Sequence, residues 1–241
     1  MNYLLFFLIP VLIYCINFYI TRYQYFLNFS GENHQKILGI KNTPLSGGIF
    51  LILFLSIIFL EKDIITYIFL ILIFLLGLFS DLKILSVPSS RLFYQSILVV
   101  SFVHFSNFDT ISTRVIFIDQ ALQNYYVSIL FSSFCLIILI NGTNFIDGLN
   151  SLVSNYFIIV ILALLILNKH YLNFQIDNIY EIKILLFVLI VFTFFNFFGY
   201  TFLGDSGSYL ISFILGYFLI NIYNQNQDIS PYFIVLLLWY P

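Results

Sequence analysis

Residues 125–167 read YYVSILFSSFCLIILI, then NGTNFIDGLN, then SLVSNYFIIVILALLIL. Two apolar runs, at 125–140 and 152–167, enclose a segment that holds three amides, a carboxylate and two glycines. A helix needs about 20 apolar residues to cross a bilayer, and somewhat fewer when aromatic residues anchor its ends. The two runs therefore predict two membrane spans. The polar groups between them are functional candidates, because ionisable groups at the boundary of a membrane span are costly unless they are used.

The composition rules out an ordinary soluble domain. Hydrophobic residues make up 61% of the 241 residues and charged residues 8%, whereas soluble domains carry about 25% charged residues. The net charge of −2 provides no basic surface, so nucleic acid is excluded as a partner. We expect an all-α fold, a polytopic transmembrane helical bundle in a lipid bilayer.

Apolar runs of suitable length recur along the whole chain. They predict spans at 3–20, 46–60, 64–79, 92–106, 125–140, 151–167, 183–199 and 207–222. A ninth span begins at Pro231 and is incomplete at Pro241, since these eleven residues cover about half a crossing. The interpretation is one integral-membrane domain over 1–241, with about nine spans present and its C-terminal part missing.

Gly, Asn and Asp cluster only in alternate connections between the spans. The clusters lie at 43–48, 80–91, 141–150 and 200–206. Two spans separate each cluster from the next, so all four are expected on the same face of the membrane. Lys and Arg number five on that face and four on the other, a difference too small to orient the chain.

Three carboxylates, Asp81, Asp147 and Asp205, stand at the membrane boundary on the shared face. Such oxygen-rich sites suit Mg²⁺, which binds one or two carboxylates and leaves its other positions to water and substrate phosphate. For any one of them the alternative role is a helix cap, because Asp is a favoured N-cap residue. Three on one face favour a metal and phosphate site.

Arg91 begins the next predicted span on the same face. A guanidinium at this position suits a lipid phosphate, which it would hold by charge-assisted hydrogen bonds. The alternative is an interfacial anchor that extends its charge to the headgroups, and Arg91 taken alone favours the anchor.

The chain resembles the polyprenyl-phosphate N-acetylhexosamine-1-phosphate transferases, glycosyltransferase family 4, over nearly its whole length. This integral-membrane family includes the translocase of peptidoglycan synthesis and the initiators of O-antigen and teichoic acid synthesis. The resemblance is carried, in order, by Thr43-Pro44 with Gly47-Gly48, by 77–81 with 91–95, by 141–149 and by 202–208. These stretches are similar to the family's Thr-Pro-x-x-Gly-Gly, Asp-Asp-loop, Asn-x-x-Asn-x-x-Asp-Gly and Phe-x-Gly-Asp-x-Gly-Ser motifs. There are two departures: Ser80 stands where the family usually has the first aspartate, and the family's His-rich loop would lie beyond Pro241.

The resemblance implies a transfer of N-acetylhexosamine 1-phosphate from a UDP-sugar to polyprenyl (undecaprenyl) phosphate, with release of UMP and with Mg²⁺ as cofactor. It implies Asp81 and Asp147 as catalytic residues and Asp147 as the metal ligand. Substrate-binding roles are implied for the following residues: Asn141, Asn144, Arg91 and Asp205. The rival interpretations are a membrane transporter with a polar site at one boundary and a non-catalytic, truncated family member.

The resemblance also implies a location and partners. UDP-sugars are cytoplasmic, so the motif face is expected on the cytoplasmic side of a bacterial inner membrane, with the N-terminus outside. The stretch 144–150 looks closer to the O-antigen branch, so UDP-N-acetylglucosamine and lipopolysaccharide or another cell-envelope polysaccharide are expected. A second copy of the chain, in a homodimer, is a further candidate partner.

Overall fold

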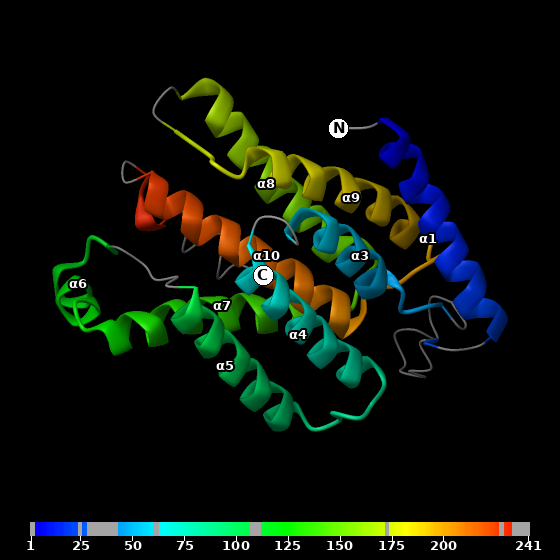
Figure 1. The fold of residues 1–241 in the computed structure, drawn as a ribbon, viewed down its shortest axis with the longest axis horizontal. Coiled ribbons are helices and arrows are strands. Elements are labelled where there is room, and N and C mark those ends of the chain that lie inside the picture. Colours follow the sequence, from blue (N-terminus) through cyan, green and yellow to red (C-terminus); the bar gives the residue numbers. More distant parts are fainter. Residues whose placement is uncertain are drawn as a thin grey trace.

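A computed structural model describes residues 3–23, 26–27, 43–59, 63–106, 112–171, 174–226 and 229–232. These residues form helices and connections without a β-strand; only an isolated bridge joins Leu27 to Pro44. The helices, drawn in Figure 1, are α1 (Tyr3–Tyr23), α3 (Gly47–Phe59), α4 (Ile64–Asp81), α5 (Pro88–Phe105), α6 (Ile116–Leu122), α7 (Tyr125–Ile146), α8 (Leu152–His170), α9 (Ile179–Phe197) and α10 (Gly204–Gln225). The predicted all-α class is confirmed.

Membrane-length helices are fewer than the predicted nine spans. Within the described ranges, five helices are long and apolar enough to cross a bilayer: α4, α7, α8, α9 and α10. Helix α3 has 13 residues, and the first turns of α5 are polar, so neither meets that measure. The predicted ninth span lies outside the described residues except for Pro231 and Tyr232. The short helix α6 was not predicted.

Helix α10 occupies the centre of the bundle, with α3, α4 and α7 packed against it (Figure 1). Sixteen of its 22 residues are buried. The surrounding helices instead direct large apolar side chains outwards, among them Phe134, Ile159 and Phe194. This distribution suits a bundle whose outer surface faces lipid tails and whose centre contacts only protein.

Two glycines bring α3 and α4 close to the beginning of α10. A Cβ at Gly48 would overlap the side chain of Ser206, and one at Gly77 would lie 2.7 Å from the backbone N of Ser206. Only a residue without a side chain permits the helix backbones to approach this closely. The motif glycines therefore place α3 and α4 against the N-terminal turn of α10.

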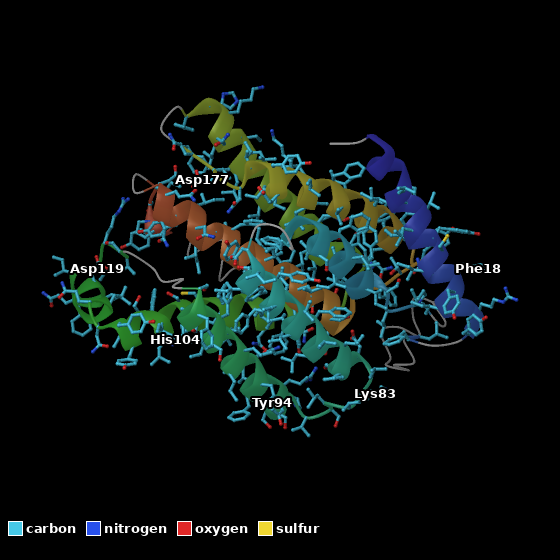
Figure 2. All side chains as sticks on the ribbon, in the orientation of Figure 1. Phe18, Lys83, Tyr94, His104, Asp119 and Asp177 are labelled. Carbon is cyan, nitrogen blue, oxygen red and sulfur yellow. The ribbon has the colours of Figure 1, made fainter. Side chains whose placement is uncertain are left out.

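The two ends of the bundle carry different connections (Figure 2). Lys83, in the connection from α4 to α5, lies at the end where α10 begins. Asp119 of α6 and Asp177, between α8 and α9, lie at the opposite end. The described connections thus separate into two faces, as the alternation of polar clusters predicted.

Candidate active site

The N-terminus of α10 is capped by a carboxylate from another helix. The first turn of any helix leaves backbone N–H groups without partners inside the helix, and Leu203 at the N-cap supplies no side-chain bond. Asp81, the last residue of α4, accepts hydrogen bonds from Asp205 N at 2.8 Å and from Ser206 N at 3.0 Å. Its negative charge also complements the positive end of the α10 dipole. Asp81 therefore has the helix-cap role that was considered for the aspartates, and the helix that it caps is α10 rather than its own helix α4.

Gly204 makes this cap geometrically feasible. Its φ of +70° is a conformation that residues with side chains rarely adopt. A Cβ at this position would also lie 2.9 Å from Asp81 Oδ2. A side chain at position 204 would therefore strain the turn and crowd the capping carboxylate.

Asp205 forms an ion pair with Arg91. The Nη1 atom of Arg91 lies 2.7 Å from Asp205 Oδ2 and 2.9 Å from Ser80 Oγ. The Ser80 hydroxyl donates to the same Asp205 oxygen. The side chains of Arg91 and Asp205 are 24% and 25% exposed, so a solute can reach the pair. The structure therefore joins the ends of α4, α5 and α10 through one polar cluster, which we call the Arg91 cluster: Ser80, Arg91 and Asp205.

The amides of α7 connect the third motif to its neighbours. Asn144 Oδ1 accepts a hydrogen bond from Ser208 Oγ of α10 at 3.1 Å. Asn141 Nδ2 donates to Gln95 Oε1 of α5 at 3.0 Å and to Ile137 O at 2.8 Å. Asn144 thus lies beside the motif of α10, whereas Asn141 contacts α5.

Asp147 follows the last residue of α7 and is partly buried. Its carboxylate forms no hydrogen bond or ion pair within the described part of the chain. Burial, followed by the negative charges of Asp205 and Asp81, raises the pKa of Asp147 well above its ordinary value. Asp147 lies at the end of a helix rather than at its start, so an N-cap role does not describe it. It is the carboxylate of the site best placed to gain from a cation.

The three aspartates do not together form a preformed metal cage. In the ranges that the structure describes, no group of three or more His, Cys, Asp or Glu side chains is arranged to hold a metal ion. Mg²⁺ does not require such a cage, because it commonly takes one or two carboxylates together with water and substrate phosphates. Asp147, which has no protein partner among the described residues, fits that mode of binding.

The first motif supports the loop that leads into α10. Phe202 N donates to Pro44 O at 2.9 Å, and Gly47 N donates to Phe202 O at 3.0 Å. The hydroxyls of Ser46 and Thr201, both buried, lie 2.6 Å apart. These hydrogen bonds fix the start of α10 on the start of α3.

Several residues of the site were missed by sequence reasoning. Asn196 accepts a hydrogen bond from Ser151 N and donates to Thr201 O at 2.7 Å, so it joins the connections that precede α8 and α10. Gln95 is fully buried against Asn141. Both are amides inside apolar runs, and that placement was the available signal. Ser80 entered the sequence analysis only as a departure from a motif and Ser208 only as the last residue of one, and neither was assigned a role.

Gly148 differs from the glycines that pack against α10. A Cβ at this position would meet nothing within 4 Å, and its φ is not positive. Neither packing nor backbone geometry requires glycine here. The open space lies next to Asp147 in the chain, where a ligand would need access.

The sequence matches the family model described as glycosyl transferase family 4 over residues 64–223. The match begins at α4 and ends inside α10, so it includes the Arg91 cluster and the segment 141–150. No curated protein matched the chain.

Proposed function

The chain belongs to glycosyl transferase family 4, and on that premise we propose that it transfers N-acetylhexosamine 1-phosphate from a UDP-sugar to polyprenyl phosphate. A phosphate oxygen of the lipid forms a bond to the β-phosphorus of the UDP-sugar. The bond from that phosphorus to the bridging oxygen breaks, and UMP leaves with this oxygen. The products are polyprenyl-diphosphate-sugar and UMP, and the lipid product begins a cell-envelope polysaccharide.

The single observation that carries the proposal is the arrangement of charge at one membrane boundary. Asp147 lies unpaired in the field of Asp81 and Asp205, and Arg91 is accessible beside Asp205. A carboxylate available to a cation and an accessible guanidinium at the same end of the bundle suit a diphosphate and a phosphate that must meet. The polar groups gather at this end of the bundle rather than along a path through it, which favours the transferase over a transporter.

We assign the following roles to the residues of the site. Asp147 would hold Mg²⁺, and water and diphosphate oxygens would complete its coordination. When bound, Mg²⁺ neutralises the diphosphate and stabilises the leaving UMP. Asn144 contacts nucleotide or phosphate, Arg91 holds phosphate, and Asp205 keeps Arg91 in place. Asn141 supports the wall of the site through Gln95.

Asp81 is assigned an orienting role. Both of its oxygens accept backbone N–H groups of α10, so its charge is already engaged. A phosphate monoester has a second pKa of about 6, so the attacking lipid phosphate needs little help to lose a proton at neutral pH. The contribution of Asp81 is therefore to hold the N-terminal turn of α10 in position.

We predict that transfer requires all three components together. In detergent, the protein is expected to release UMP only with UDP-N-acetylhexosamine, polyprenyl phosphate and Mg²⁺, and to move radiolabelled sugar into the lipid fraction under the same conditions. UDP-N-acetylglucosamine is the first donor to test. Release of sugar that is indifferent to the lipid or to chelation of Mg²⁺ contradicts the assignment.

The proposed orientation places the motif end in the cytoplasm of a bacterial inner membrane, because UDP-sugars are cytoplasmic. We predict that, with Cys15 and Cys135 replaced by serine, Gln123→Cys reacts with an impermeant thiol reagent in intact cells. Ser86→Cys should react only after permeabilisation. Both positions are exposed and lie at opposite ends of the bundle. The reverse pattern would contradict the orientation, and labelling of both in intact cells would contradict the two-faced arrangement.

A further inference from the structure

The Nη1 atom of Arg91 has no hydrogen-bonding capacity left. A guanidinium carries five N–H donors, two of them on Nη1. These two are used by Asp205 at 2.7 Å and by Ser80 at 2.9 Å. The guanidinium carries three further donors on Nε and Nη2, and the Tyr209 hydroxyl is a further side-chain hydrogen-bond partner of Arg91. Tyr209 offers a single oxygen, so donors of Arg91 beyond Nη1 remain for a ligand.

The Nε–Nη2 edge of Arg91 has the shape that a phosphate needs. The N–H groups of Nε and Nη2 are parallel and lie in the guanidinium plane, so they match two oxygens of a phosphate. The Arg91 side chain is 24% exposed, so protein does not seal the residue from a ligand. Two contacts on Nη1 fix the direction of the plane, whereas one contact alone would permit the guanidinium to turn about it.

Ser80 supplies the second of these contacts. Its hydroxyl accepts from Arg91 and donates to Asp205, which closes a ring of three hydrogen-bonded groups. Ser80 is 9% exposed, so water does not readily replace its hydroxyl. An aspartate at this position would set a second carboxylate against Asp205 and compete for the same Nη1 atom. A neutral hydroxyl keeps Arg91 on Asp205.

We propose that Ser80 is a positioning residue: its hydroxyl orients Arg91 so that the Nε–Nη2 edge accepts a phosphate group of the substrates in a bidentate manner. The inference rests on the proposed transfer reaction for its biological meaning. The phosphate site that it predicts can be measured by binding alone, without the transfer reaction.

The test is the affinity for inorganic pyrophosphate, measured by microscale thermophoresis on the complete protein in detergent. Ser80→Ala is expected to weaken binding about 10-fold, the scale of losing a hydrogen bond to a charged group. Arg91→Lys, which keeps the charge but loses the planar guanidinium that can contact two phosphate oxygens, is expected to weaken binding at least as much. Ser80→Thr, which restores the hydroxyl, should bind within about twofold of the wild type. Ser89→Ala is the matched control, since Ser89 is exposed and its hydroxyl makes no hydrogen bond among the described residues.

The outcomes separate the positioning role from packing and from the proposed reaction. Equal pyrophosphate affinity in Ser80→Ala and wild type overturns the inference, as does equal weakening in Ser80→Ala and Ser80→Thr. Ser80→Cys, which is nearly isosteric, replaces Ser80→Ala if that variant does not fold, and is expected to weaken binding in the same direction. Weakened binding in a protein that transfers no sugar supports the role of Ser80 and rejects the proposed function. In an active protein, Ser80→Ala should raise KM for a phosphate substrate about 10-fold, and Ser89→Ala should leave it unchanged.

Discussion

Asp147→Asn is expected to lower sugar-phosphate transfer by a factor of at least about 100, the scale of losing a principal electrostatic contribution at a phosphoryl-transfer site. The substitution keeps the size of the side chain but removes the charge that a hard cation needs. The carboxylate has no hydrogen-bonding partner among the described residues, so none is left unpaired. The charge lies close to Asp205 and Asp81, and its removal relieves repulsion in the folded protein. Folding should therefore be normal.

The effect of Asp147→Asn on transfer is measured as turnover with saturating Mg²⁺, and its effect on folding as the thermal unfolding temperature in detergent. Asp177→Asn is the matched control: this carboxylate lies at the opposite end of the bundle, where Gln225 Nε2 donates to it at 2.8 Å. This exposed hydrogen bond involves a neutral amide and lies away from the site, so we expect turnover within about twofold of the wild type. Normal turnover in Asp147→Asn, at unchanged Mg²⁺ dependence, would remove Asp147 as the metal ligand.

Gly77→Ala is expected to damage both stability and transfer. The new Cβ would overlap the Cα of Ser206 and would lie 2.8 Å from the carbonyl oxygen of Asp205. These are backbone atoms of α10, so relief requires α4 to move as a whole. Overpacking of this kind costs about 1–3 kcal/mol of unfolding free energy. The movement also withdraws Asp81 from the start of α10, and a misplacement of about 1 Å costs roughly 100-fold in rate.

Gly148→Ala is the matched control for the loss of stability in Gly77→Ala. Its Cβ meets nothing within 4 Å, so the thermal unfolding temperature should equal that of the wild type. Transfer is nevertheless expected to fall through a higher KM for the UDP-sugar, because the methyl group occupies open space next to Asp147. If Gly77→Ala unfolds at the wild-type temperature, the close packing of α4 on α10 is incorrect.

The five long helices followed from the sequence because their apolar runs have the length of a membrane crossing. Their ends did not follow in the same way. Helix α5 begins at Pro88, four residues before the predicted span, since proline is well suited to the first helical position and polar serines complete the turn. Helix α7 continues through Asn141 to Ile146, because Gln95 and the backbone of its own helix satisfy the Asn141 amide. Polar residues here mark the site without ending the helix.

The site was predictable as a location but not as a set of contacts. The alternation of polar clusters placed the four motifs on one face, and the structure joins them through α10. Which side chains meet depends on the rotation of each helix and on its closest approach to α10, and these are set by Gly48 and Gly77. Asp81, for which the resemblance implied a catalytic role and the sequence alone left a helix cap open, is found capping α10. Ser80, in the sequence only a departure from a motif, is found between Arg91 and Asp205.

The central position of α10 has a consequence for the synthesis of the protein. Of the five long helices, α10 is the least apolar and the most buried, and the serines at 206, 208 and 212 are fully enclosed. Such a segment partitions poorly into lipid on its own, because its hydroxyls would meet hydrocarbon. Helices α3, α4 and α7 leave the ribosome first, so the surfaces that receive α10 are already in the membrane when it emerges. We therefore expect α10 to remain at the insertion machinery until it docks, and nascent chains whose earlier helices cannot receive it to be degraded.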